Sequence, residues 1–153
     1  NLFDAILEAV NGIWLKAEAK NIIIEVNDCS VDCSQTIMYD RKWLSEAFVN
    51  ILDNAVKYSG ENTEISIHIA KLNQMMRIEF KDQGMGIPDE EKHNVFKRFY
   101  RGTASSSACG SGVGLYLARR IISEHQGTIM VKDNVIDGTK KGSLFVVHLP
   151  INQ

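Results

Sequence analysis

The 153-residue sequence has no marked excess of charge of either sign and few cysteines or prolines. Its 17 Lys and Arg residues nearly balance 19 Asp and Glu residues, so neither nucleic acid nor an anionic membrane is predicted as a partner. No apolar run approaches the roughly 18 residues needed to span a bilayer. The three cysteines cannot all pair within the chain and form no C-x-x-C motif, which favours a reducing, cytoplasmic location over a disulfide scaffold or zinc site.

A chain of this length can bury enough apolar surface for one stable domain, and no long polar linker or internal repeat divides it. We therefore predict a single domain over residues 1–153. The first residue is Asn rather than Met, from which we expect the chain to be the cytoplasmic part of a longer, membrane-bound protein.

Hydrophobic periodicity predicts three helices, at residues 2–19, 41–58 and 113–126. Asp40 is expected to cap the second helix and Gly60 to close it, while Gly127 is expected to stop the third. Strand patterns cover residues 22–26, 65–69, 76–80, 128–132 and 143–149, with a hairpin turn at 72–74 and a short helix after Pro88. These elements predict an α/β (α+β) two-layer sandwich, in which helices pack on one face of a mixed, partly antiparallel sheet.

Four polar residues share one face of the predicted helix 41–58. Glu46, Asn50, Asn54 and Lys57 lie within a stripe about 80° wide, opposite the apolar stripe. Asn is a poor helix former, so two aligned asparagines lower helix stability without an obvious structural return. Either they are buried amides satisfied by loop backbone, or an amide oxygen is a ligand for Mg²⁺ on a nucleotide and Lys57 meets phosphate charge.

Two glycine-rich segments also suggest a ligand site. Asp82-Gln83-Gly84-Met85-Gly86-Ile87 places a carboxylate, an acceptor for an adenine amine, before two glycines that permit close backbone approach; the alternative is a simple turn. Gly110-Ser111-Gly112-Val113-Gly114-Leu115 precedes a helix and favours an anion at its positive end; the alternative is a flexible loop. It is not a Walker A motif, because no Lys-Ser/Thr follows.

Between these segments, residues 95–101 alternate aromatic and basic side chains, and small residues follow at 103–108. We expect the aromatic residues to anchor a mobile lid and Arg98 or Arg101 to reach a terminal phosphate. Single-stranded nucleic acid is disfavoured, because the cluster is short and the domain slightly acidic.

The order of these motifs resembles the catalytic domain of sensor histidine kinases, from about Leu2 to Leu149. An Asn-rich helix is followed by D-x-G-x-G, F-x-x-F and G-x-G-x-G-L, and both Asn54-Ala55-Val56-Lys57-Tyr58 and Phe99-Tyr100-Arg101-Gly102 are intact. The resemblance implies the Bergerat ATP-binding fold and a protein-histidine kinase. Such a domain, itself monomeric, uses ATP and Mg²⁺ to phosphorylate a histidine in the dimerisation domain of a homodimeric parent, which signals to a response regulator.

The resemblance also implies roles for individual residues. Asn54 would bind Mg²⁺, Asn50 and Lys57 would contact phosphates, Tyr58 would lie against adenine and Asp82 would accept from its amine. The residues expected to contact ATP are Asn50, Asn54, Lys57, Tyr58, Asp82, Gly84, Gly86, Ile87, Phe99, Arg101, Gly110, Gly112, Val113, Gly114 and Leu115. The residues expected to act in catalysis are Asn50, Glu46 and Arg98.

Two departures refine this expectation. ATP-hydrolysing relatives carry a glutamate general base where this chain has Asn50, which suits a kinase that spares ATP from water. No histidine here has the sequence context of the phosphate acceptor, so the acceptor helices are expected upstream. A serine kinase of the anti-sigma-factor type and a nucleotide-sensing module without transfer activity are the alternatives.

Overall fold

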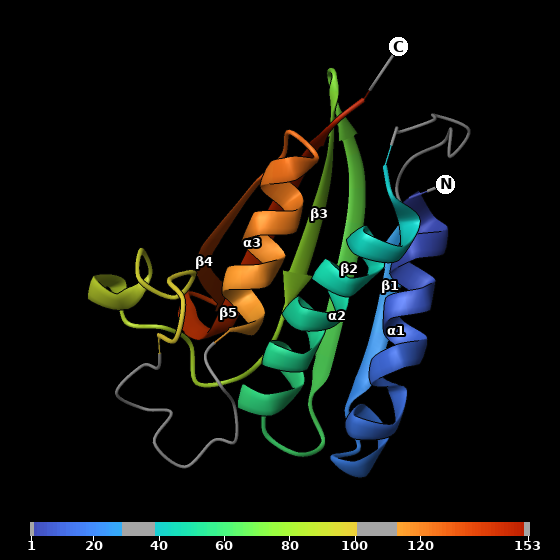
Figure 1. Ribbon diagram of the computed structural model, residues 1–153. Helices are drawn as coiled ribbons and strands as arrows, with labels where there is room; N and C mark the ends of the chain where they lie inside the picture. Colours follow the sequence, from blue (N-terminus) through green and yellow to red (C-terminus); the bar gives the residue numbers. More distant parts are fainter. Residues whose placement is uncertain (1, 29–38, 101–112, 152–153) are drawn as a thin grey trace.

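The computed structural model describes residues 2–28, 39–100 and 113–151, and within them three helices cover one face of a five-stranded sheet (Figure 1). The helices are α1 (Leu2–Ala19), α2 (Arg41–Tyr58) and α3 (Gly114–Glu124), with a 3₁₀ turn η1 at Asp89–Glu91. The strands are β1 (Ile23–Asp28), β2 (Glu64–Leu72), β3 (Met75–Lys81), β4 (Thr128–Ile136) and β5 (Thr139–Pro150). Their order is β1-β2-β3-β5-β4, and only β1–β2 is a parallel pair, which confirms the predicted mixed sheet.

The core lies between the sheet and the helices. Alternate residues of β2 and β3 are buried, as their period-two pattern predicts, and Ile67 pairs with Phe80. The ring of Phe48 in α2 lies 5.7 Å from the ring of Phe80, both fully buried. Burial of one such side chain contributes about 1.5–3 kcal/mol. This contact holds the apolar face of α2 on the sheet and turns its polar stripe away from it.

The ends of α2 show one correct and one wrong prediction. Asp40 caps the start, since its Oδ1 accepts from the backbone N–H groups of Lys42 and Trp43 at 3.1 and 3.2 Å. Gly60 does not close the helix: its φ is not positive, and the cap residue is Ser59 in an extended conformation. Instead Lys20 Nζ donates to the carbonyl oxygens of Val56, Lys57 and Ser59 at 2.8, 3.0 and 3.0 Å, respectively. Lys20, in the turn that follows α1, therefore supplies a cation to the negative end of α2.

Helix α3 ends earlier than predicted, and Gly127 is not its stop. Gln126 takes the left-handed conformation at φ 64°, and Gly127 N–H then donates to Ile122 O at 2.9 Å. Gly127 lacks a side chain for a different reason, because a Cβ there would lie 2.4 Å from His148 O. The helix terminus is thus packed directly against β5.

Strands β4 and β5 extend well beyond their predicted ends and form one long hairpin. Asp137 and Gly138 join them with φ of 51° and 77°, the pattern of a type I′ turn. The Asp-Gly dipeptide was therefore a hairpin signal that the sequence interpretation missed. None of the helices in the described ranges combines the length and apolar character that a bilayer-spanning helix needs.

Candidate functional site

Two segments distant from α2 in sequence, the loop after β3 and the start of α3, lie against α2 (Figure 1). A Cβ on Gly84, in the loop after β3, would lie 2.4 Å from Tyr58 O at the end of α2. A Cβ on Gly114, at the start of α3, would lie 3.5 Å from Asn50 Oδ1. The structure therefore brings together the Asn-rich stripe, the D-x-G-x-G segment and the start of the third helix, as the predicted site requires.

The polar stripe is only partly open to solvent. Asn50, Asn54 and Lys57 are half-buried, whereas Glu46 is exposed. Asn50 Nδ2 is buried, and no described residue accepts a hydrogen bond from it. An unsatisfied buried donor costs about 1–3 kcal/mol. The described residues thus give no support to the alternative in which loop backbone satisfies this amide.

Lys57 lies in an ion pair that the sequence interpretation did not foresee. Its Nζ is 3.9 Å from Asp53 Oδ2, and Lys16 of α1 approaches Asp53 Oδ1 at 2.9 Å. These contacts are partly exposed and therefore weak. The contact with Asp53 places the Lys57 ammonium one turn back along α2, nearer to Asn50 than its own backbone is.

Asp82 is a buried carboxylate held by backbone amides. Its residue is 3% exposed, and Oδ1 accepts from the N–H groups of Gly84 and Ser143, both at 3.0 Å. Burial raises the pKa of Asp82, while the two hydrogen bonds lower it and only partly offset the effect. Neither bond uses Oδ2. The arrangement thus offers a fixed acceptor in a place where a negative charge is poorly solvated.

Glycines let the backbone close around this carboxylate. Gly86 has φ 75°, a conformation that favours glycine. Gly142 in β5 has φ 106°, and a Cβ there would lie only 2.0 Å from Asp82 O. The sequence interpretation missed both Gly142 and Ser143. The available signal was an isolated glycine directly before the predicted strand 143–149. In the structure it lies inside β5, where a glycine marks a bulge or a close backbone approach.

The remaining predicted residues of the site divide into three groups. Ile87 and Leu115 are half-buried and pack against the hydrophobic core, so they have a structural role in addition to any contact with a ligand. Val113 is half-buried and precedes the first residue of α3. The predictions for Arg101, Gly110 and Gly112, and for the lid at 103–108, lie outside the described residues.

Only one of the two phenylalanines of the F-x-x-F segment is buried. Phe96 is buried and meets Phe145 edge-on, with ring centroids 6.1 Å apart. Phe99 is instead 63% exposed and has φ 64°, so the expectation that both aromatics are anchors is wrong for Phe99. The Arg98 guanidinium lies 4.7 Å from the Phe99 ring centroid and 6.0 Å from that of Tyr116.

Comparisons with known proteins identify the family to which this fold and site belong. A family model described as histidine kinase-, DNA gyrase B- and HSP90-like ATPase matches residues 39–153. The chain therefore belongs to this ATPase family. Within it, the chain is homologous to MprB and other sensor histidine kinases.

Two curated relatives illustrate this homology. The signal transduction histidine-protein kinase/phosphatase MprB of Mycobacterium sp. (strain KMS) is 37% identical over 112 residues, 72% of this chain and 22% of the relative. The sensor histidine kinase YvrG of Bacillus subtilis (strain 168) is 36% identical over 107 residues, 69% of this chain and 18% of the relative. The chain thus spans about a fifth of the length of these relatives.

Solved structures confirm the predicted α/β sandwich. The mycobacterial sensor histidine kinase MprB superposes with a TM-score of 0.87 at 26% identity, covering 98% of this chain and 95% of that one. The catalytic domain of histidine kinase ThkA gives 0.81 at 26% identity, with 99% and 95% covered. ThkA in complex with the response regulator protein TrrA gives 0.80 at 25% identity, with 99% and 41% covered.

Proposed function

We propose that this chain binds ATP with Mg²⁺ and donates the γ-phosphoryl group to a histidine in the dimerisation domain of the same protein. The observation that carries the proposal is Asp82. It is a buried carboxylate without a salt bridge to any described residue, held by two backbone amides beside glycines where a flat ligand can approach. A carboxylate in that setting is suited to accept a hydrogen bond from an amine such as that of adenine.

The described residues fit a nucleotide along α2. Asp82, Gly84 and Tyr58 would form the base end, and any side chain at position 84 would collide with the Tyr58 carbonyl. Asn50 lies eight residues before Tyr58, roughly 12 Å along the helix. Its buried Nδ2 needs an acceptor, which a phosphate oxygen would supply.

The phosphate end combines neutral and positive groups. Asn54 would hold Mg²⁺ through its amide oxygen, and the metal would neutralise phosphate charge during transfer. Lys57, whose Nζ reaches back to Asp53 one turn nearer to Asn50, would meet the phosphates from there. The first residues of α3 would offer backbone N–H groups, with Gly114 beside Asn50. Binding and charge neutralisation would then do most of the work of transfer.

Hydrolysis is disfavoured by the same residues. Asn50 is an amide and does not act as a general base for water. Glu46 lies one turn further along α2 and is exposed. Arg98, whose guanidinium lies near the rings of Phe99 and Tyr116, would contribute to transfer by contacting a phosphate and supplies no base for water.

For the parent protein we propose a homodimeric kinase with this domain in the cytoplasm and a response regulator as the downstream partner. The relative ThkA, solved in complex with a response regulator, supports the last point.

The test is to label the full-length parent with ATP carrying a radioactive γ-phosphate. The label should be lost in acid and survive alkali, as phosphohistidine does. A label stable to acid but lost in alkali would identify a serine kinase instead. Labelling that is unchanged after Asp82→Asn would contradict the proposed site.

A further inference from the structure

Three hydrogen bonds join Asp82 to the β4–β5 hairpin. Its N–H donates to Ser143 O at 2.9 Å, and its Oδ1 accepts from Ser143 N–H at 3.0 Å. The third contact comes from β4, where Asn134 Nδ2 donates to Asp82 O at 2.9 Å. Asp82 lies one residue beyond the last β3–β5 pair, Lys81 with Leu144, so the regular ladder does not hold its carbonyl.

A β-bulge makes the Asn134 contact possible. Asp133 pairs with Ser143 and Val135 with Lys140, so Asn134 alone faces two residues of β5. Strand β5 lies between β3 and β4, which in a flat sheet would separate them by about 10 Å, further than an asparagine side chain reaches. One of the two facing residues is Gly142, which leaves no Cβ between the hairpin and the Asp82 carbonyl. The bend at the bulge and the missing side chain at Gly142 together let the Asn134 amide reach the Asp82 carbonyl.

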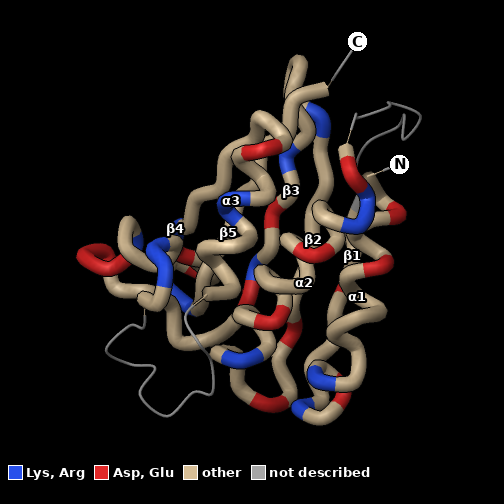
Figure 2. The backbone as a smooth tube through the Cα atoms, in the orientation of Figure 1, with Lys and Arg blue, Asp and Glu red and all other residues tan. Residues whose placement is uncertain are grey.

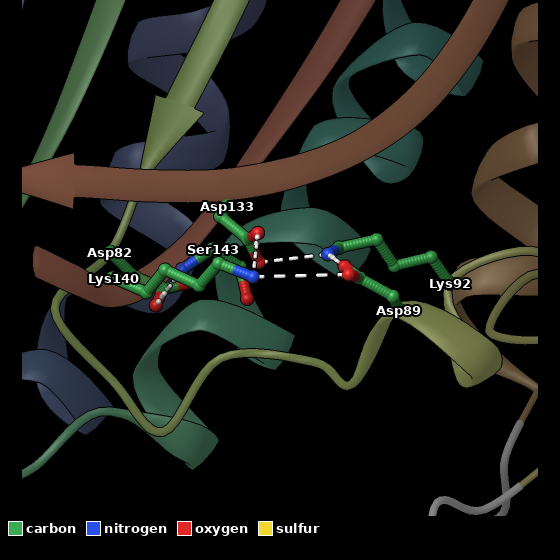
Figure 3. A network of polar contacts seen from close by, with 6 residues as sticks. All are labelled: Asp82, Asp89, Lys92, Asp133, Lys140 and Ser143. Carbon is green, nitrogen blue, oxygen red and sulfur yellow. Dashed lines mark hydrogen bonds and ion pairs between the residues drawn. The ribbon is translucent and has the colours of Figure 1, made fainter.

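A cluster of four charged residues fastens the same part of the hairpin (Figure 3). Asp133, next to Asn134, is contacted by Lys92 Nζ at 2.8 Å and by Lys140 Nζ at 3.2 Å. Both lysines also contact Asp89 in η1. The side chains of Lys92 and Asp133 are only 18% and 20% exposed, so water screens this pair less than most surface pairs. The cluster joins the turn after the glycine segment to the hairpin that holds Asp82.

We propose that Asn134 is a positioning residue that fixes Asp82 and thereby sets the preference of the site for adenine, an inference that rests on the proposed function. Adenine offers an amine to the Asp82 carboxylate, whereas hypoxanthine offers a carbonyl oxygen that the carboxylate repels. This discrimination depends on the orientation of the carboxylate. Asn134 fixes the carbonyl of the same residue, and the Lys92–Asp133 pair holds Asn134 in place.

The experiment compares dissociation constants of the domain for ATP and for inosine triphosphate. Asn134→Ala removes the donor, and Asn134→Asp removes it while keeping the side-chain shape. Each should reduce the preference for ATP roughly three- to tenfold, the equivalent of one hydrogen bond, with little change for inosine triphosphate. Lys92→Met should reduce the preference in the same direction. Lys132→Ala, an exposed residue of the same strand, is the matched control and should leave it unchanged.

The outcomes are separable. A wild-type domain that binds no ATP would overturn the proposed function and the inference with it. A wild-type domain that binds ATP and inosine triphosphate equally would overturn the inference and leave ATP binding standing. A wild-type preference that persists in both Asn134 variants would overturn only the role of Asn134. Affinities for both nucleotides that fall by the same factor would show that Asn134 is merely structural. Thermal unfolding of each variant verifies that the compared proteins are folded.

Discussion

The substitution Asp82→Asn separates the proposed ligand-binding role of this residue from its structural role. An asparagine keeps one acceptor oxygen, which can still receive the N–H groups of Gly84 and Ser143 that now bind Oδ1. The reverse orientation would set the amide NH₂ against these two donors. The NH₂ must therefore take the place of Oδ2, so an acceptor becomes a donor while the supporting bonds remain.

The expected effect on ATP binding is large. A hydrogen bond to a charged group is worth about 1.5–3 kcal/mol, so its loss should weaken binding roughly 10- to 150-fold. Titration with a fluorescent ATP analogue measures the effect. The control is Asp137→Asn, the same chemical change at an exposed turn residue whose φ of 51° asparagine tolerates well. Equal affinities of wild type and Asp82→Asn would remove Asp82 from the base end of the site.

The same variant should not be less stable without nucleotide. Burial raises the pKa of Asp82 above its usual value of 3.8, so the native state retains the proton to higher pH than the unfolded chain does. The stability present below that usual value is therefore lost as the pH rises through the raised pKa. Asn has no such loss, so in thermal unfolding the variant should gain stability relative to wild type as the pH rises above the usual value of 3.8. A wild type that becomes more stable relative to Asp82→Asn as the pH rises would contradict the raised pKa of Asp82.

Three further substitutions test two structural contacts near the proposed site and the role of Asn50. Lys20→Met removes three hydrogen bonds to the end of α2 and should lower the free energy of unfolding by about 1–3 kcal/mol in denaturant titration. The control Lys16→Met breaks an exposed ion pair and should change the free energy of unfolding by less than about 1 kcal/mol. Gly142→Ala should destabilise more than Gly138→Ala by the same measurement; both have positive φ, but only at 142 would the new Cβ strike a carbonyl oxygen, at 2.0 Å. Asn50→Glu should raise phosphate release at saturating ATP by supplying a base, and an unchanged rate would count against that reading.

Local sequence patterns were sufficient for the elements that bury a continuous apolar face. Helices α1 and α2 begin and end where the 3.6-residue period predicts, and the hairpin between β2 and β3 follows from strict alternation. Charges of both signs are interspersed along the chain in Figure 2, in keeping with the balanced composition.

The missed features are contacts between residues far apart in sequence. Lys20 meets the end of α2 across 36 to 39 positions, and Asn134 meets Asp82 across 52. Such pairs depend on how the elements pack, which no local period encodes. The prediction for Phe99 was wrong for a related reason: the F-x-x-F spacing reveals neither its positive φ nor the exposure of its ring.

Two residues of the proposed site are unfavourable for the protein alone, and they have opposite hydrogen-bonding character. Asn50 Nδ2 is a buried donor with no acceptor among the described residues, and Asp82 is an acceptor whose charge burial disfavours. At about 1–3 kcal/mol for an unsatisfied group, the first alone is a sizeable part of the 5–15 kcal/mol that stabilises a typical domain.

An adenosine nucleotide carries a donor amine at its base and acceptor oxygens at its phosphates, so one ligand would satisfy both groups. In the reverse orientation, phosphate would face the Asp82 carboxylate and the two charges would repel each other. In the proposed site, an acceptor at Asp82 beside the end of α2 and a donor at Asn50 would therefore select how the nucleotide lies, with its phosphates at Asn50.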